Sequence, residues 1–389
     1  MKKIKIHYWS PFISKIATVK AVLNSAYSMS KFSKNSFDVS IINSFGEFKT
    51  FETNSNLKYF KTVSLLKKDY SKIFSDKGFI LSRLSWFLIV IITFFPLLKL
   101  IKKDKPDYLV IHLLTILPLI INYFFNLNTK IILRISGFPK LNFFRKFLWK
   151  IMLPKVHAIT CPTIGTKEYI LSQNFISPEK VFYLADPIIE INKLNKNIEK
   201  TNNYKTKFKR YIFSAGRLTK QKNYNFLINC FSDLEKNIDD LKLVIAGDGE
   251  EKENLNNLIK KLNLNNKVEM IGYSNDVFSL MKNSLCFVSS SLWEDPGFVL
   301  VEAIACRTPV ISSSCKNGPQ EILLKGRGGY LYKTNDKRDF IEKFNEFYEH
   351  LNNSPDNLFQ KKLEAFKNVK IYSKYSHYKS FSKIIQNYV

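Results

Sequence analysis

The fold class of this chain is decided by residues 211–216, Tyr-Ile-Phe-Ser-Ala-Gly. This short run is mostly apolar and ends at a glycine, which is typical of a buried strand in a parallel sheet. Phe226, Leu227 and Cys230 follow at helical spacing. A strand that turns into a helix is the repeating unit of a parallel α/β sheet. The turn lies at the carboxyl edge of the strands, where such sheets bind ligands.

Two cations, Arg217 and Lys222, lie on the loop that follows this strand. Positive groups at a ligand-binding edge suit a leaving diphosphate, because negative charge builds on it as its bond to a sugar breaks. The alternative is two solvated surface cations, since the whole chain is basic. Gly216 opens the loop and is included in the predicted donor site.

Two further loops follow predicted strands of the same kind. Residues 241–246 form an apolar run that ends at Gly247, in a tight Gly-Asp-Gly turn. Residues 285–288 form another such run, and the loop after it leads to Glu294 and Glu302, with seven residues between them. Glu302 lies on a helical pattern and Glu294 in the loop before it, so both carboxylates are expected on one side of a ligand.

The acidic loop has the chemistry to hold a sugar nucleotide. Carboxylates accept hydrogen bonds from sugar and ribose hydroxyls. The amides of Gly297 and Phe298 lie at a predicted helix start, which favours an anion. Solvated helix glutamates are the alternative, but a glutamate within an apolar run is less easily explained that way. The three loops together fit a nucleotide diphosphate attached to a sugar.

These motifs resemble glycosyltransferase family 4, one of the group 1 glycosyltransferases. The resemblance is carried by Gly-Arg-x4-Lys at 216–222, Ala-Gly-Asp-Gly-Glu at 246–250, Glu-x7-Glu at 294–302 and Asn-Gly-Pro-Gln-Glu-Ile-Leu at 317–323. It is strong over residues 211–332 and weaker over the first half. It implies an α/β fold with two facing Rossmann-like domains and a cleft between them, called GT-B. It also implies transfer with retention of the sugar's anomeric configuration.

The resemblance also implies residue roles. The two cations of the first loop would hold the donor diphosphate, and with Glu294, which would contact the transferred sugar, they are the predicted catalytic residues. Glu302 would contact the ribose, while Gly247 and Tyr273 would lie near the base. No protein nucleophile is needed, because the leaving diphosphate can take the acceptor proton. We expect no cofactor and no metal, since the sequence has neither an Asp-x-Asp motif nor metal-ligand spacing of Cys and His.

The length of 389 residues favours two domains. We predict an N-terminal acceptor domain over 1–187 and a C-terminal donor domain over 188–371. The resemblance suggests that a last helix, about 372–389, packs back on the first domain. Two residues of the first domain are candidates for the acceptor site. Lys15 stands where the family often has a Gly-Gly pair, and His112 ends a predicted strand over 108–112.

Three stretches of the first half are candidates to contact or cross a membrane. Residues 81–103 include an uncharged run of thirteen, 86–98, which is too short to span a bilayer, and they are expected to form a buried or interfacial helix. Residues 108–127 carry no Lys, Arg, Asp or Glu and could be a membrane span, but we prefer a strand followed by a helix. Residues 129–156 hold seven Lys or Arg and no Asp or Glu. Within them, a helix over 141–153 fits either a membrane surface or a core with a basic face.

The net charge of +27 implies an anionic partner. Five cysteines without a Cys-x-x-Cys pattern indicate a reduced, cytoplasmic protein, and we expect no signal peptide. The resemblance, together with the hydrophobic and basic stretches of the first half, implies transfer from a UDP- or GDP-sugar to a glycan or polyprenyl-linked acceptor in bacterial lipopolysaccharide or capsule synthesis. The protein would be peripheral, on the inner face of an anionic plasma membrane. The alternatives are a nucleotide-sugar epimerase and a nucleic-acid-binding protein; we favour a protein that binds no nucleic acid.

Overall fold

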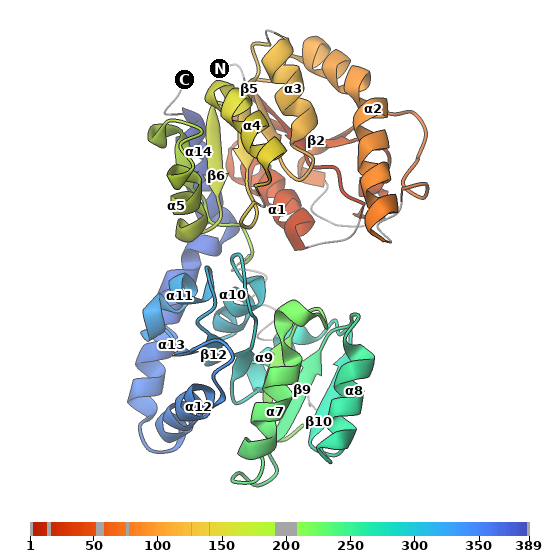
Figure 1. Ribbon diagram of the computed structural model, residues 1–389. Helices are drawn as coiled ribbons and strands as arrows, with labels where there is room; N and C mark the ends of the chain where they lie inside the picture. The colour runs from red at the N-terminus through yellow and green to blue at the C-terminus, as the bar shows by residue number, and fades with distance from the viewer. Residues whose placement is uncertain are drawn as a thin grey trace. The chain divides into compact units, whose positions relative to one another are not determined.

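The computed structural model describes residues 3–13, 17–51, 58–74, 78–125, 127–139, 141–190 and 208–386. The chain divides into two compact units (Figure 1). Unit 1 comprises Met1–Pro187 and Lys374–Val389, and unit 2 comprises Ile188–Ser373. Each unit is a parallel sheet with helices on both faces, so the prediction of two Rossmann-like domains is confirmed. The cleft between them stays a prediction.

The sheet of unit 1 has seven parallel strands in the order β3-β2-β1-β4-β5-β6-β7. The strand order reverses between β1 and β4, and a reversal of this kind is where such sheets bind ligands. The strands are β1 (Ile4–Trp9), β2 (Phe37–Asn43), β3 (Lys61–Ser64), β4 (Tyr108–Ile111), β5 (Lys130–Arg134), β6 (Ala158–Cys161) and β7 (Val181–Tyr183).

Six α-helices of the described part of unit 1 cover this sheet. They are α1 (Ala17–Phe32), α2 (Phe79–Asp104), α3 (Ile116–Phe124), α4 (Phe143–Met152), α5 (Ile164–Ser172) and α14 (Lys374–Gln386). Successive strand residues point to opposite faces. Tyr108 and Val110 of β4 therefore join one core with α1 and α14, while Leu109 and Ile111 join another with α2, α3 and α4.

The helix α14 is tied to unit 1 by buried hydrogen bonds as well as by apolar packing. The ring of His377 bonds to Ser25 Oγ and to the carbonyl oxygen of Ala185, each at 2.8 Å. A carbonyl only accepts, so Nδ1 carries the proton and Nε2 accepts from the Ser25 hydroxyl. The hydroxyl of Tyr108 donates to the carbonyl oxygen of Ile385 at 3.0 Å.

The sheet of unit 2 has six parallel strands in the order β10-β9-β8-β11-β12-β13, with its reversal between β8 and β11. The strands are β8 (Tyr211–Ala215), β9 (Lys242–Ala246), β10 (Val268–Gly272), β11 (Phe287–Ser289), β12 (Val310–Ser313) and β13 (Tyr330–Tyr332).

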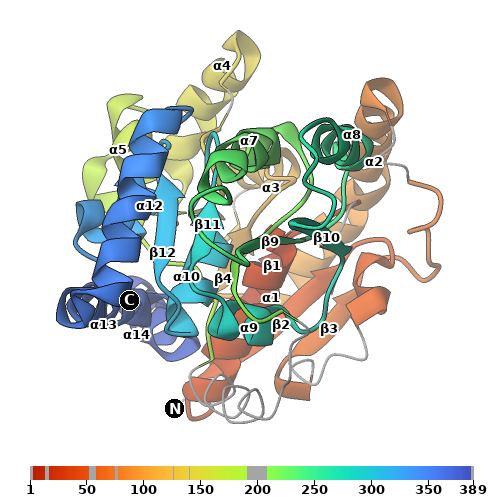
Figure 2. The same ribbon diagram turned by 90° about the horizontal axis from the view of Figure 1, so that it is seen from below.

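The helices of unit 2 form two layers. Figure 2 shows α7, α8 and α12 on one side of the sheet and α9, α10 and α13 on the other. The bounds are α7 (Tyr224–Leu234), α8 (Lys252–Lys261), α9 (Val277–Asn283), α10 (Phe298–Ala305), α11 (Pro319–Ile322), α12 (Lys337–Asn352) and α13 (Pro355–Val369).

Two expectations about the apolar stretches can be compared with the helices. The strand and helix preferred over 108–127 are present as β4 and α3. The length argument for 81–103 was wrong, because it counted only the uncharged part of a helix that runs over 26 residues. By length and composition, Ile80–Asp104 could cross a membrane, although a third of its most apolar window is buried in the protein.

Candidate active site

The loops at the strand-order reversal of unit 2 carry Lys222 and Glu294. The loop after β8 begins at Gly216 and includes a single 3₁₀ turn, η5 (Lys220–Lys222). The loop after β11 runs to α10 and contains Glu294. Because β8 and β11 are neighbours, their carboxyl ends bring two segments 72 residues apart to one point of the sheet edge.

Lys222 and Glu294 form an ion pair at this point. Lys222 Nζ donates to Oε1 of Glu294, and the Ser291 hydroxyl donates to the same oxygen at 2.6 Å. The exposed fractions of the two side chains are 16% for Lys222 and 7% for Glu294. A carboxylate removed from water to this extent requires such donors, because an unpaired buried charge is strongly destabilising.

Three more hydrogen bonds hold the two loops together. The backbone amide of Leu292 donates to the carbonyl oxygen of Gln221 at 2.8 Å. The side-chain amide of Gln221 donates to the carbonyl oxygen of Trp293, also at 2.8 Å. The Ser290 hydroxyl donates to the carbonyl oxygen of Lys222 at 2.8 Å. The backbones that carry the ion pair are therefore fixed relative to each other, which preorganises its side chains.

The Gly-Asp-Gly loop after β9 is pressed against the first loop. Gly247 has a φ of +147°, and a Cβ at this position would overlap the carbonyl oxygen of Gly216. The Gly216 amide donates to Ala246 O at 2.9 Å, and the Gly247 amide donates to Gly272 O at 2.8 Å. Only glycine allows this backbone approach, which aligns the ends of β8, β9 and β10 at one edge.

The acidic loop is also supported by the Asn-Gly turn after β12. A Cβ on Gly318, whose φ is +42°, would overlap the carbonyl oxygen of Pro296. The Asn317 side chain donates to Asp295 at 3.4 Å. Gly297 has a φ of +100° and ends the loop at the N-terminus of α10. The 317–321 motif thus contributes by holding the loop that carries Glu294.

Residues 195–362 match the family model described as glycosyl transferases group 1. This segment of the chain is similar to group 1 glycosyl transferases. It includes the three loops described above and all the residues of the Lys222–Glu294 site.

Two curated relatives match a similar share of the chain. An uncharacterized glycosyltransferase of Methanocaldococcus jannaschii is 35% identical over 249 residues, which are 59% of this chain and 61% of the relative. The N-acetylgalactosamine-N,N'-diacetylbacillosaminyl-diphospho-undecaprenol 4-alpha-N-acetylgalactosaminyltransferase of Campylobacter jejuni is 30% identical over 228 residues, or 58% and 60%. The chain therefore spans about three fifths of the length of these relatives.

Solved structures share the fold of the whole chain at low identity. The Anabaena protein Alr3699/HepE, in complex with UDP and glucose, has a TM-score of 0.74 at 13% identity and covers 99% of this chain and 100% of its own. A glycosyltransferase of Rickettsia africae has a TM-score of 0.74 at 16% identity and covers 100% of both chains. The similarity shows the fold with two Rossmann-like domains.

The other predicted donor residues lie on several elements of unit 2. Arg217 is exposed, one residue after Gly216. Tyr273 directly follows β10 and is 84% exposed. Phe298 opens α10, and Glu302 lies one turn further along this helix, half-buried. The structure thus joins Lys222 directly to Glu294 and leaves the donor roles of these residues as predictions.

The two acceptor candidates belong to unit 1. Lys15 lies outside the described residues. His112 directly follows β4, is 2% exposed and lines a cavity of about 440 Å³. Burial and the nearby charge of Arg134 hold the pKa of His112 well below its usual value, so its ring is neutral at physiological pH.

Sequence reasoning missed two residues that position the site. Ser291 donates directly to Glu294, and Gln221 links the two loops. A signal existed for the first, because three successive serines, 289–291, begin at the end of a predicted strand. Serine at a sheet edge supplies short hydroxyl donors. Among the described residues, no group of His, Cys, Asp and Glu is placed to hold a metal ion, and the absence of a metal requirement stays a prediction.

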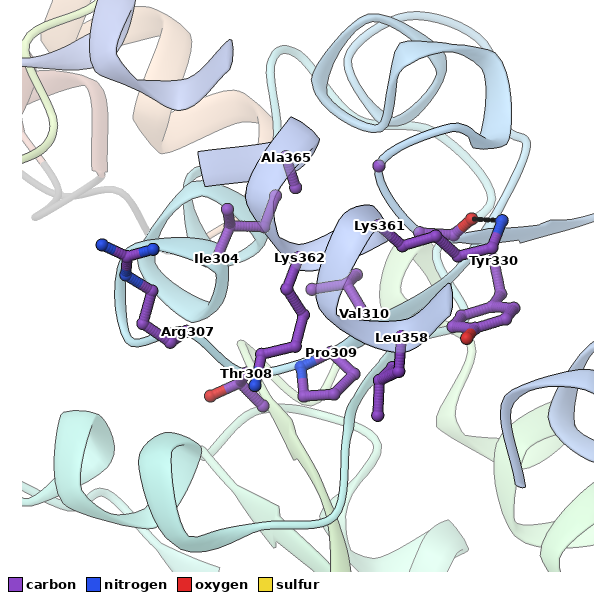
Figure 3. Close-up of a pocket in the computed structure, with 12 residues that line it drawn as sticks. Ile304, Arg307, Thr308, Pro309, Val310, Tyr330, Leu358, Lys361, Lys362 and Ala365 are labelled. Carbon is purple, nitrogen blue, oxygen red and sulfur yellow. Dashed lines mark hydrogen bonds between the residues drawn. The ribbon is translucent and has the colours of Figure 1, made fainter. Parts of the chain in front are cut away.

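Another hollow of unit 2 contains none of the predicted site residues (Figure 3). It lies beside α13, where Lys361 and Lys362 face Arg307 and Tyr330. The Lys361 ammonium donates to the carbonyl oxygen of Gly326 at 2.9 Å. The cavity measures about 10 Å³, which is room for about one water molecule. This hollow is a packing feature of unit 2.

Proposed function

We propose that this protein is a retaining glycosyltransferase that moves a sugar from a nucleotide diphosphate to a lipid-linked glycan. The observation that carries the proposal is the Lys222–Glu294 pair, fixed at the strand-order reversal of unit 2, within the segment that is similar to group 1 glycosyl transferases. The names of the relatives and the UDP and glucose in the HepE complex support this class of reaction.

The site can supply charge stabilisation to the transfer. The bond between the anomeric carbon and the donor diphosphate breaks, and the bond to the acceptor oxygen forms on the same face of the sugar. The acceptor proton passes to the leaving diphosphate, so no separate base is needed. Lys222 and Arg217 stabilise the charge that develops on the diphosphate. Glu294, oriented by Ser291, accepts hydrogen bonds from hydroxyls of the transferred sugar.

Three observations support a lipid-linked acceptor at an anionic membrane. The Campylobacter relative and an Escherichia coli relative, 28% identical over 183 residues, have diphosphoundecaprenol in their names. The chain has a net charge of +27. Large apolar side chains are exposed on α2 and α4 of unit 1. We infer a cytoplasmic, peripheral enzyme of surface polysaccharide synthesis, such as that of lipopolysaccharide or capsule.

A donor screen tests the reaction class. The purified protein is incubated with a panel of UDP- and GDP-sugars, and free nucleotide diphosphate is measured with and without a mixture of lipid-linked glycans. We expect one donor to release nucleotide faster with acceptor, and NMR of the product to show the anomeric configuration of the donor. Lys222→Met should lose this activity and Arg338→Gln, on exposed α12, should keep it.

Two results would reject the proposal. One is full activity in Lys222→Met, because the diphosphate would then not depend on this cation. The other is conversion of one sugar nucleotide into another without an acceptor, which is the behaviour of an epimerase. An inverted product would reject only retention and leave glycosyl transfer in place.

A further inference from the structure

Tyr224 is the first residue of α7 and follows the loop that carries Lys222. It belongs to the apolar core of unit 2 and is 3% exposed. Among the residues that the structure describes, its hydroxyl has no hydrogen-bond partner. A buried hydroxyl without a partner destabilises the folded state, and native structures keep few of them. The hydroxyl of Tyr224 therefore needs an explanation other than packing.

The phenol of Tyr224 is a proton donor. Burial raises its pKa, the nearby Ser214 hydroxyl opposes this shift, and the charge of Glu294 adds to it. The phenol therefore keeps its proton at physiological pH. Ser214 itself donates to the carbonyl oxygen of Val288 at 2.6 Å, and it does not form a hydrogen bond of normal geometry with Tyr224.

The Tyr224 hydroxyl lies beside the Lys222–Glu294 pair. A Cβ on Gly216 would be 3.0 Å from the hydroxyl oxygen of Tyr224, 3.2 Å from Lys222 Cε and 3.4 Å from Lys222 Cδ. The hydroxyl and the end of the lysine side chain therefore pack against the same point of the backbone. The charge of Glu294 acts on the phenol as well. An unused proton donor thus lies next to both charged groups of the site.

The Lys222 ammonium has two anions to bind in the proposed reaction. It donates to Glu294 in this structure, and it would stabilise the diphosphate of the donor. A lysine is a compact charge on a flexible stem, and Lys222 is 16% exposed, so the ammonium can turn toward a ligand. A diphosphate carries more negative charge than one carboxylate and attracts the ammonium more strongly. Glu294 would then keep the Ser291 hydroxyl and lose its cation, and a buried carboxylate is strongly destabilised by such a loss.

The juxtaposition of a buried, unused hydroxyl with a carboxylate that shares its lysine points to an exchange of donors. We propose that Tyr224 is a positioning residue whose hydroxyl donates to Glu294 when a diphosphate draws Lys222 away. This inference rests on the proposed function and deepens it, because it explains how Glu294 keeps its orientation toward the sugar while Lys222 acts on the diphosphate. It also explains why the hydroxyl is kept in the core, since its partner becomes available only with ligand.

The first test compares the stability of two variants of the full-length protein without ligand. Tyr224→Phe removes the hydroxyl and keeps the ring, so the melting temperature should stay the same or rise by about 2–4 °C. Tyr211→Phe on β8 is the matched control, because the Tyr211 hydroxyl donates to the carbonyl oxygen of Leu280 at 2.7 Å. Its loss should lower the melting temperature by a similar amount and leave ligand binding unchanged.

The second test measures affinity by calorimetric titration with UDP, GDP and inorganic pyrophosphate. Tyr224→Phe should weaken binding of these ligands about tenfold or more, because Glu294 lacks a replacement donor once Lys222 has turned. In a Glu294→Gln background the same substitution should change the affinity by less than about twofold, since no carboxylate then needs the donor. A tyrosine that only supports packing would show no such dependence on Glu294.

Three results would overturn this inference. Equal affinities of the unaltered protein and Tyr224→Phe would mean that no exchange of donors occurs. An equal loss of affinity in the Glu294→Gln background would mean that the hydroxyl does not act through Glu294. A lower melting temperature of Tyr224→Phe without ligand would mean that the hydroxyl is already satisfied in the free protein, as by a buried water.

The donor screen separates this inference from the proposed function. If a diphosphate binds with the expected dependence on Tyr224 but no sugar is transferred, the glycosyltransferase proposal fails and the exchange of donors stands. If a sugar is transferred and Tyr224→Phe binds UDP and GDP as the unaltered protein does, the exchange of donors fails alone. If UDP, GDP and pyrophosphate all fail to bind the unaltered protein, both proposals fail.

Discussion

Replacing Lys222 with methionine tests the central ion pair most directly. Methionine keeps most of the length of the side chain but removes the charge, so Glu294 loses the Lys222 ammonium as a donor and keeps the Ser291 hydroxyl. Removing one partner of a fully buried ion pair costs about 3–5 kcal/mol. Lys222 is 16% exposed, and some water reaches the carboxylate, so we expect a loss of about 2–3 kcal/mol in the free energy of unfolding of unit 2.

A double-mutant cycle isolates the interaction. Glu294→Gln removes the other charge and leaves a cation that can reach water, so its cost should be about 1 kcal/mol. The double variant should be more stable than the sum of the two changes predicts, by about 1–2 kcal/mol, because no buried charge remains unpaired. Urea unfolding of all four proteins, followed by tryptophan fluorescence, gives the free energies.

The activity of the same variants completes the test. Lys222→Met should lower kcat/KM by about a hundredfold or more, as does the loss of a group that stabilises transition-state charge. Glu294→Gln should impair discrimination between donor sugars more than nucleotide binding. Stability changes that add within about 0.5 kcal/mol, together with unchanged turnover, would show that the pair is a surface contact with no part in the reaction.

Acidification should destabilise unit 1 through His377, because burial lowers the pKa of this histidine to about 3. Between about pH 6.5 and pH 3 only the unfolded chain takes up a proton on this histidine. The free energy of unfolding should therefore fall by up to about 1.4 kcal/mol per pH unit as the pH drops. His377→Asn should reduce this dependence on pH, measured as the urea midpoint at each pH. Gly247→Ala should lower the free energy of unfolding by over about 2 kcal/mol, because the new Cβ would overlap the Gly216 carbonyl. Gly272→Ala has open space around it and should lower the free energy of unfolding by about 1 kcal/mol, through backbone strain alone. Thermal melting of the two variants tests this difference. Phe147→Ser on α4 should weaken binding to phosphatidylglycerol vesicles about tenfold, and equal weakening by Phe359→Ser on α13 would contradict a membrane-facing α4.

Much of the fold could be read from the sequence because parallel strands are buried on both faces and appear as short continuous apolar runs. The strands β8, β9 and β11 were all found in this way, each followed by a loop with polar residues. Because the carboxyl ends of parallel strands lie at one edge of the sheet, we could then predict which loops lie close together. The sequence could not predict that Lys222 bonds to Glu294, because this pairing depends on the neighbouring positions of β8 and β11 in the sheet.

The parts that could not be predicted depend on contacts between distant segments. The motif at 317–323 contributed only to the family resemblance, and the structure shows that its Gly318 allows a close backbone approach to Pro296. The argument that α2 is too short to span a bilayer counted only an uncharged run, which Arg83 and the lysines near the end of the helix interrupt without ending the helix. The amphipathic helix over 141–153 had two possible environments, and only the structure shows that Phe143, Phe144 and Phe147 are exposed while Trp149 is buried.

The last helix gives this protein an unusual order of assembly during synthesis. Unit 2 is one uninterrupted segment, whereas unit 1 is built from both ends of the chain. Phe381, Ile384 and Ile385 of α14 pack on one face of the first sheet. Because α14 follows unit 2 in the chain, this packing can form only after unit 2 has been translated. The half that is translated first is therefore the half that matures last. Until then the apolar surface that α14 will cover stays exposed, and chaperones can bind to such a surface.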